Sequence, residues 1–273
     1  MSSNVVCIYH KHCNDGFAAA LAVYLKHPYA EFTPMQYGEH APHFVGKDVI
    51  VVDFSFKRQE VLDLKERANS LIIIDHHKSS QKELSGLPYC IFDMERSGCV
   101  LAWQHYHPGK ALPELFRYIQ DRDLWLFELP ETEAVCAALA LIPSELALWE
   151  PLINDEQLAM LIERGSIIRE YQKICVARSI KKAVVQKFLG YTVPVINCTH
   201  LISEVGNVLC KEYPFAVMYF DERDRRVFSL RSDEGGIDVS VIAAHNGGGG
   251  HRHAAAFSVK RKNGEDYLQT LNK

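Results

Sequence analysis

The stretch SLIIIDHHKSS, residues 70–80, joins an apolar run directly to an acid and two histidines. Residues 71–74 are Leu-Ile-Ile-Ile, a run typical of a strand that is buried on both faces of a parallel sheet. Asp75, His76 and His77 follow without a spacer. Because a buried strand needs no such residues for its stability, we expect a site at this strand end that requires oxygen and nitrogen ligands.

The composition narrows the class of protein. The chain has 273 residues, 48% of them hydrophobic, and a formal net charge of -4, which disfavours capture of long nucleic acids but allows short phosphate ligands. The eight cysteines form no C-x-x-C pair, which favours reduced thiols. The sequence shows no signal-peptide pattern and no run of about 18 apolar residues, so we expect a cytoplasmic protein without a membrane partner.

The first part of the chain alternates apolar runs with helix-like segments, which predicts an α/β domain with a parallel sheet. The expected strands are residues 5–9, 49–52 and 71–74, and the expected helices are residues 17–25, 59–69 and 97–105. This parallel-sheet domain is assigned residues 1–150.

The rest of the chain predicts a helical linker and a smaller α/β domain. Residues 155–187 contain few helix breakers and are interpreted as one long helix, so residues 151–189 are assigned to the linker. In the C-terminal domain, residues 190–273, a strand is expected at 192–198 and a hairpin at 215–232.

Three strand ends carry acids and imidazoles. The first strand ends at His10, the second at Asp53 and the third at Asp75-His76-His77. Ligands of open parallel sheets bind outside the carboxyl ends of the strands, so we expect these side chains to converge. A single acid after a strand is often a helix cap, but three coincident strand ends favour a site.

The predicted cluster has the donor types of a metal site. Carboxylates and imidazoles without paired thiolates suit manganese, iron, cobalt or magnesium better than structural zinc. More ligands are present than one ion needs, and two ions about 3.5–4 Å apart around a shared carboxylate are suited to phosphoester hydrolysis. Asp121 and Asp123, in QDRDLW, are a further ligand source, unless they are solvated charges at a helix end.

The combination of IIIDHHKSS, Asp53 upstream of it, His10 and Asp15 near the N-terminus and GGGGHRHAAAF near the C-terminus resembles the DHH/DHHA1 phosphoesterase superfamily. The resemblance covers nearly the whole chain. It implies a catalytic DHH domain (1–150), a helical linker (151–189) and a substrate-binding DHHA1 domain (190–273), with a cleft between the domains. It also implies two ions, usually Mn²⁺, with Mg²⁺, Co²⁺ or Fe²⁺ as alternatives.

The resemblance also implies roles for individual residues. The implied metal ligands are His10, Asp15, Asp53 as the bridging carboxylate, His76, and Asp123 with Asp121 as its rival. Asp75 and His77 complete the catalytic motif around His76, with His77 nearer the substrate.

The first motif departs from the family pattern. Family members commonly carry two aspartates two residues apart after the histidine, whereas this chain reads His10-Lys11-His12-Cys13-Asn14-Asp15. Cys13 occupies roughly the place of the missing acid. It is either a thiolate ligand or an inert neighbour while His12 or water fills the position, and we favour the inert neighbour.

The C-terminal domain contains the residues expected to bind a phosphate. Gly249 and Gly250 would bring backbone amides close to an anion, and His251 would donate to the phosphate. Arg231 is a candidate partner for a terminal phosphate. The alternatives are a flexible glycine linker with a surface histidine, and an exposed arginine at a strand end.

Together these features predict a metal-dependent phosphodiesterase that uses a water activated by two metals. The expected substrates are short single-stranded oligonucleotides or cyclic or linear dinucleotides, cleaved to nucleoside monophosphates. The alternatives are a phosphomonoesterase acting on a small bisphosphorylated nucleotide such as phosphoadenosine phosphate, and a non-catalytic nucleotide-binding regulator. The exact substrate, the polarity of cleavage and the preferred metal stay open, as does assembly into a homodimer.

Overall fold

The computed structural model describes residues 4–260. The chain divides into two compact units, Met1–Arg169 and Glu170–Lys273. The division falls inside helix α8 (Asp155–Ile180), which belongs to the segment that the sequence assigns to the linker.

The first unit is built on a five-stranded sheet with the order β2-β1-β3-β4-β5, in which every pairing is parallel. The strands are β1 (Val5–His10), β2 (Glu31–Met35), β3 (Asp48–Val52), β4 (Ser70–Asp75) and β5 (Cys90–Phe92). The expectation of an α/β fold with an N-terminal parallel sheet is confirmed. The central strands β3 and β4 are rich in Val and Ile, as strands covered on both faces usually are.

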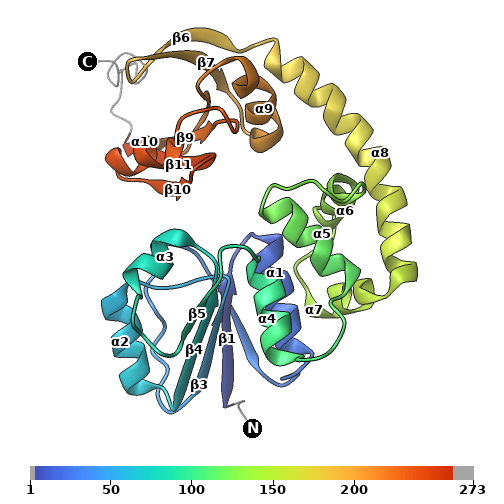
Figure 1. The fold of residues 1–273 in the computed structure, drawn as a ribbon, viewed down its shortest axis with the longest axis vertical. Helices are drawn as coiled ribbons and strands as arrows, with labels where there is room; N and C mark the ends of the chain where they lie inside the picture. Colours follow the sequence, from blue (N-terminus) through green and yellow to red (C-terminus); the bar gives the residue numbers. More distant parts are fainter. Residues whose placement is uncertain (1–3, 261–273) are drawn as a thin grey trace. The chain divides into compact units, whose positions relative to one another are not determined.

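Helices cover both faces of this sheet (Figure 1). One core contains the Ala-rich helix α1 together with α4, α5 and the start of α8, and the other contains α2 and Leu84, the residue directly after α3. The helices of the unit are α1 (Asn14–Tyr24), α2 (Arg58–Arg67), α3 (Lys78–Glu83), α4 (Gly98–Tyr106), α5 (Glu114–Asp123), α6 (Thr132–Leu139), α7 (Leu146–Trp149) and the 3₁₀ turn η1 (Glu150–Ile153).

The second unit is a six-stranded mixed sheet with the order β10-β11-β9-β8-β7-β6, in which only β7 and β8 are parallel neighbours. Its strands are β6 (Val184–Phe188), β7 (Tyr191–Asn197), β8 (Ala216–Asp221), β9 (Arg225–Arg231), β10 (Gly249–His251) and β11 (Ala254–Lys260). Helix α10 (Val239–His245) packs into one apolar core, and α9 (Ile202–Leu209) packs with the end of α8 into the other. The short 3₁₀ turn η2 (Cys210–Glu212) follows α9.

Two elements differ from the sequence expectation. Helix α8 ends at Ile180 rather than near residue 187, because Val184 and Val185 begin strand β6, which pairs with β7. The sequence also did not predict the edge strands β2 and β5, which are short and only partly buried. Strand β2 contains Pro34, a residue that sheets tolerate at their edges.

In residues 4–260, no helix combines the length and the apolar character that a membrane crossing requires.

Gly165 of α8 is a packing position. A Cβ at this residue would lie 1.8 Å from the backbone oxygen of Ala134 in α6, so only glycine permits this approach. We therefore expect Gly165→Ala to lower the free energy of unfolding by about 1–3 kcal/mol through overpacking, although alanine is the better helix former. Urea unfolding measures the change. Ser166→Ala, at the adjacent exposed residue, is the matched control, and its free energy of unfolding should stay within about 0.5 kcal/mol of that of the parent chain. A Gly165→Ala protein that is more stable than the parent chain would contradict the close packing of Gly165 against α6.

Candidate metal centre

The predicted strand ends meet at one edge of the parallel sheet. The register pairs Tyr9 of β1 with Val52 of β3, and Val52 with Ile74 of β4, so all three strands end at the same level. As a result, the Nδ1 atom of His10 lies 3.5 Å from Oδ2 of Asp53, and the Nε2 atom of His76 lies 3.2 Å from Oδ1 of Asp53.

Asp53 is the centre of this cluster. The residue is 1% exposed, and none of the described residues donates a hydrogen bond to either of its carboxylate oxygens. Burial alone would raise the pKa of Asp53, but the imidazoles of His10 and His76 hold it well below its usual range. Its φ of 52° is left-handed, a conformation that costs a non-glycine residue about 1–3 kcal/mol and that is typical of functional sites.

Asp15, at the start of α1, is held by the N-terminus of a second helix. The backbone N–H groups of Gly98 and Cys99, in the first turn of α4, donate to its two carboxylate oxygens at 2.6 and 3.1 Å. A helix N-terminus favours a negative charge, so α4 fixes Asp15 as a carboxylate beside His76, at 3.8 Å. Burial, together with the nearby charge of Asp53, raises the pKa of Asp15 to about 6.

The structure separates the two rival aspartates at the end of α5. Asp123 reaches the cluster, with Oδ2 3.4 Å from the Nε2 atom of His76. Asp121 is buried elsewhere: it accepts hydrogen bonds from the N–H groups of Glu128 and Leu129 and from the hydroxyl of Thr132. Asp123 therefore belongs to the cluster, whereas Asp121 holds together the turn between α5 and α6.

The three residues of the motif Asp75-His76-His77 have different roles. Asp75 is fully buried and accepts hydrogen bonds from the N–H of His76 at 2.8 Å and from the Nδ1 atom of His77 at 2.7 Å. This bond fixes the proton of His77 on Nδ1 and orients its ring. Burial alone would lower the pKa of His76, but the neighbouring carboxylates of Asp53, Asp123 and Asp15 raise it to about 10.

Asp53 is shared by two groups of donor atoms, one with His10 and Cys13 and the other with His76 and His77. A third group, Asp15, His76 and Asp123, adjoins them through His76, and the donor atoms of each group lie within 4.8 Å of one another. The buried carboxylate oxygens of Asp53 and the Nδ1 atom of His10 lack hydrogen-bond partners among residues 4–260. Buried polar atoms of this kind need a cation or another partner, so the donor set fits divalent ions.

The predicted substrate-binding residues lie in the second unit. Arg231 ends β9, and its guanidinium donates to the hydroxyl of Ser203 at 2.9 Å and to the carbonyl of Leu230 at 2.8 Å. Gly249, Gly250 and His251 form β10 and are exposed. The roles of all four residues stay predictions.

The run of four glycines, residues 247–250, has structural reasons of its own. Gly247 has a φ of +80°, directly after the end of α10. A Cβ at Gly248 would lie 2.1 Å from the oxygen of Ala256, and one at Gly250 would lie 2.5 Å from that of Ala254. Gly248 and Gly250 therefore allow β10 to lie against β11, whereas Gly247 and Gly249 have no such close neighbour.

Two residues near the cluster were not predicted. Gly98 of α4 packs against Asp15 and Asp53, and the sequence offers only its position at a helix start as a signal. Tyr37, in the loop after β2, is 48% exposed and has its ring centroid 5.3 Å from that of His10 and 5.7 Å from that of His77. No pattern in the sequence links this tyrosine to the histidines.

Gly98 should be essential for the geometry of the cluster. A Cβ there would lie 2.5 Å from Cβ of Asp53 and 2.9 Å from Oδ2 of Asp15, so Gly98→Ala must displace both carboxylates. We expect this variant to fold but to bind Mn²⁺ at least about tenfold more weakly, as measured by calorimetric titration. Gly235→Ala, at an exposed glycine without close neighbours and without a positive φ, is the control for a general glycine effect. Unchanged Mn²⁺ affinity of Gly98→Ala would show that the cluster does not bind the ion.

Two solved structures are similar to the chain, one of them closely enough to show a common fold. Over 98% of this chain and 97% of the other, the chain is 15% identical to the pGpG-specific phosphodiesterase PggH of Vibrio cholerae, with a TM-score of 0.57. An exopolyphosphatase-related protein of Bacteroides fragilis is 14% identical over 97% of this chain and 88% of the other, with a TM-score of 0.49. The chain therefore shares its two-unit α/β fold with PggH.

One sequence relative is much more similar. No family model matches the chain. An uncharacterized protein of Acanthamoeba polyphaga mimivirus is 32% identical over 281 aligned positions, which cover 93% of this chain and 67% of the viral protein. The chain therefore belongs to the same protein family as this mimivirus protein.

Proposed function

We propose that the chain is a metal-dependent phosphodiesterase that hydrolyses dinucleotides or short oligonucleotides to nucleoside monophosphates. The observation that carries this proposal is Asp53, a buried carboxylate without hydrogen-bond donors that is shared by two groups of metal-donor side chains. The likeness of the fold to a pGpG-specific phosphodiesterase supports it.

In this proposal, divalent ions are held by five residues of the first unit. These ligands are His10, Asp15, Asp53, His76 and Asp123. When bound, such ions lower the pKa of water and neutralise charge on a phosphate. The N-terminus of α4 keeps Asp15 oriented and charged, and Asp53 is held between two imidazoles, so the carboxylates are in place before any ion arrives.

His77 has a different task from His76. Because its Nδ1 proton is donated to Asp75, its Nε2 atom is the one suited to contact a substrate phosphate. The buried Asp75 keeps the ring in one orientation, which is the usual task of a carboxylate behind a functional histidine. His77 is therefore proposed to contact the substrate rather than to bind an ion directly.

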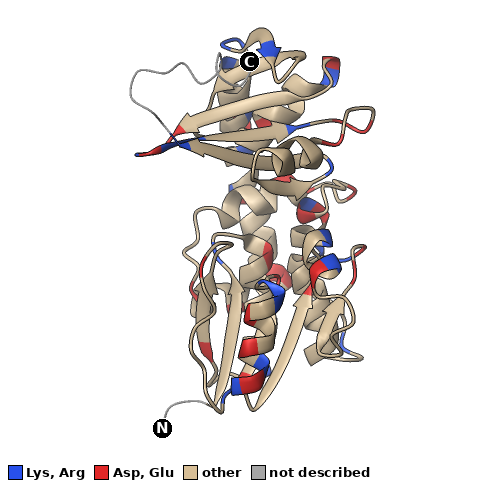
Figure 2. Cartoon of the chain, turned by 90° about the vertical axis from the view of Figure 1, so that its left-hand side faces the viewer, with Lys and Arg blue, Asp and Glu red and all other residues tan. Residues whose placement is uncertain are grey.

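The charge of the chain favours a short substrate. The formal net charge is -4, and Figure 2 shows Lys and Arg interspersed with Asp and Glu along the elements in view. Proteins that bind long nucleic acids usually gather basic residues into a stripe or groove. A dinucleotide needs only a few contacts, which we assign to Arg231, Gly249, Gly250 and His251 of the second unit. The dinucleotide pGpG, the substrate of PggH, is the first compound to test.

A substrate panel with Mn²⁺ tests the function. It contains pGpG, other dinucleotides, trinucleotides, cyclic dinucleotides and phosphoadenosine phosphate. Release of nucleoside monophosphates from a dinucleotide, lost in Asp53→Ala, is the expected result. Release of inorganic phosphate from phosphoadenosine phosphate alone would instead favour a phosphomonoesterase. Nucleotide binding without turnover in Mn²⁺, Mg²⁺, Co²⁺ or Fe²⁺ would favour a regulator.

Asp123 and Asp121 form a matched pair for the site. We expect Asp123→Asn to lower kcat at least about a hundredfold with little change in stability, since it removes an expected ligand. Asp121→Asn should do the reverse: activity per folded molecule stays, and the free energy of unfolding falls by about 1–3 kcal/mol, because buried donors lose their carboxylate acceptor. The kcat values and the urea unfolding of both variants test these expectations. A loss of kcat in Asp121→Asn, with little change of kcat in Asp123→Asn, would show that Asp121 is the ligand.

His251 tests the role of the second unit. If it donates to a substrate phosphate, His251→Ala should raise KM about tenfold or more, because hydrogen bonds to charged groups contribute about 1.5–3 kcal/mol. Exposed His245, at the end of α10, provides the control variant His245→Ala, for which KM should not change. Equal KM values for both variants would remove His251 from the substrate site.

A further inference from the structure

We propose that Cys13 is a metal ligand, and that the position formed by His10, Cys13 and Asp53 takes a borderline-soft divalent ion such as Zn²⁺, Fe²⁺ or Co²⁺. The position formed by Asp15, Asp53, His76 and Asp123 would keep an ion that prefers oxygen and nitrogen, Mn²⁺ or Mg²⁺. This inference rests on the proposed metal-dependent function and names the ion class of one position.

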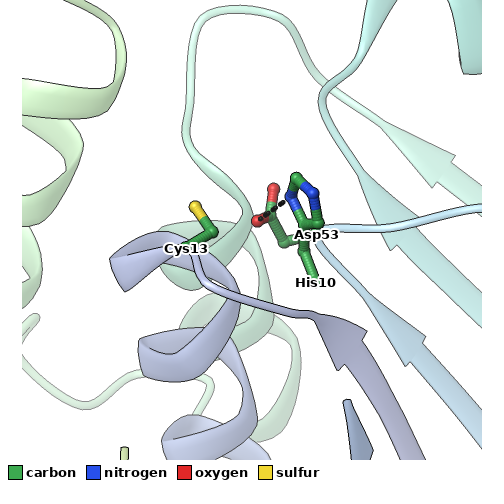
Figure 3. Close-up of side chains that lie close together, drawn as sticks. All are labelled: His10, Cys13 and Asp53. Atoms are coloured by element: carbon green, nitrogen blue, oxygen red, sulfur yellow. Dashed lines mark ion pairs between the residues drawn. The ribbon is translucent and has the colours of Figure 1, made fainter. Parts of the chain in front are cut away.

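The placement of the Cys13 thiol is the first support. One donor atom each of His10, Cys13 and Asp53 lie within 4.8 Å of one another, a separation that side-chain adjustment around one ion can close. Figure 3 shows the Cys13 side chain at the start of α1, with its sulfur on the same side as the Asp53 carboxylate and the His10 ring. His10 and Cys13 are three residues apart in the turn between β1 and α1, and the parallel pairing of β1 with β3 brings Asp53 to them.

The second support is independent of the cysteine. The Nδ1 atom of His10 and both carboxylate oxygens of Asp53 are buried and lack hydrogen-bond partners among the described residues, and Asp53 is 1% exposed. An ion at this position would satisfy these polar atoms, and two ligands are too few for the tetrahedral coordination typical of zinc. Cys13 is the donor that completes a set of three.

The local backbone disfavours His12 as the alternative ligand in place of the missing acid. His12 has a φ of 58°, in the turn between β1 and α1, and its side chain is exposed. It belongs to neither donor group, whereas Cys13, one residue later, lies beside Asp53. The expectation that Cys13 is inert is therefore replaced by the proposal that it binds the ion.

The types of ligand atom at each position determine which class of ion it prefers. Thiolate and imidazole ligands favour zinc, iron and cobalt, whereas carboxylate ligands suit magnesium and manganese. The Nε2 atom of His76 has three carboxylates within 4 Å, those of Asp15, Asp53 and Asp123. The group around His10 offers one carboxylate, one imidazole and one thiol. Because Asp53 faces both groups, it would link two ions of different chemistry.

X-ray absorption of the zinc-loaded protein tests the proposal without measuring activity. The full chain, stripped of metal and given one equivalent of Zn²⁺, should show a sulfur neighbour at about 2.3 Å. Titration with Co²⁺ should give the intense near-ultraviolet absorption of a cobalt–thiolate bond. Both signals should disappear in Cys13→Ser and in Cys13→Asp, the latter restoring the acid of the family pattern. Both should persist in the control Cys175→Ser, at a partly buried cysteine of α8.

The outcomes separate this inference from the proposed function. Zinc bound without a sulfur neighbour in the parent chain, or a sulfur signal that persists in both Cys13 variants, would overturn the role of Cys13 and leave the hydrolase proposal standing. Failure to bind Zn²⁺, Co²⁺ or Mn²⁺ at all would overturn both. The parent-chain spectrum decides even if a variant does not fold. With Cys13→Asp, we expect Zn²⁺ affinity relative to Mn²⁺ to fall by about tenfold or more.

Discussion

The burial of the Asp53 carboxylate at the edge of the parallel sheet is the constraint on which the site depends. A charge removed from water is costly unless other groups compensate it. Here two imidazoles from neighbouring strand ends lie at ion-pair distance, and neither carboxylate oxygen has a hydrogen-bond partner among residues 4–260. The left-handed backbone of Asp53 adds local strain, which the surrounding strands and helix α4 must hold in place.

Helix α4 contributes to this arrangement through its backbone rather than through its side chains. Its first N–H groups bind Asp15, and its first residue, Gly98, leaves room for the side chains of Asp15 and Asp53. Asp15 and Asp53 still repel each other, which contributes to the raised pKa of Asp15. The dipole of α4 stabilises the charge of Asp15, and the histidines stabilise that of Asp53.

The sequence predicts those parts of the structure that depend on strong local patterns. The apolar runs before Asp53 and Asp75 are unambiguous, and parallel pairing then brings their ends together. The contacts that distinguish Asp121 from Asp123 depend on where α5 ends and on the turn that follows, which no spacing reveals. Tyr37 and Gly98 could not be predicted either, because their positions result from packing between segments far apart in the chain. The length of α8 was overestimated because the pairing of β6 with β7 overrides the helical tendency of residues 181–187.

Helix α8 has a consequence for the evolution of the chain. Leu158 and Leu161 belong to the apolar core of the first unit, and Val176 belongs to a core of the second. A single continuous hydrogen-bonded element therefore supplies side chains to both interiors. Recombination at this point would strip apolar surface from one half or the other, so the two halves are expected to be inherited together rather than exchanged as separate modules.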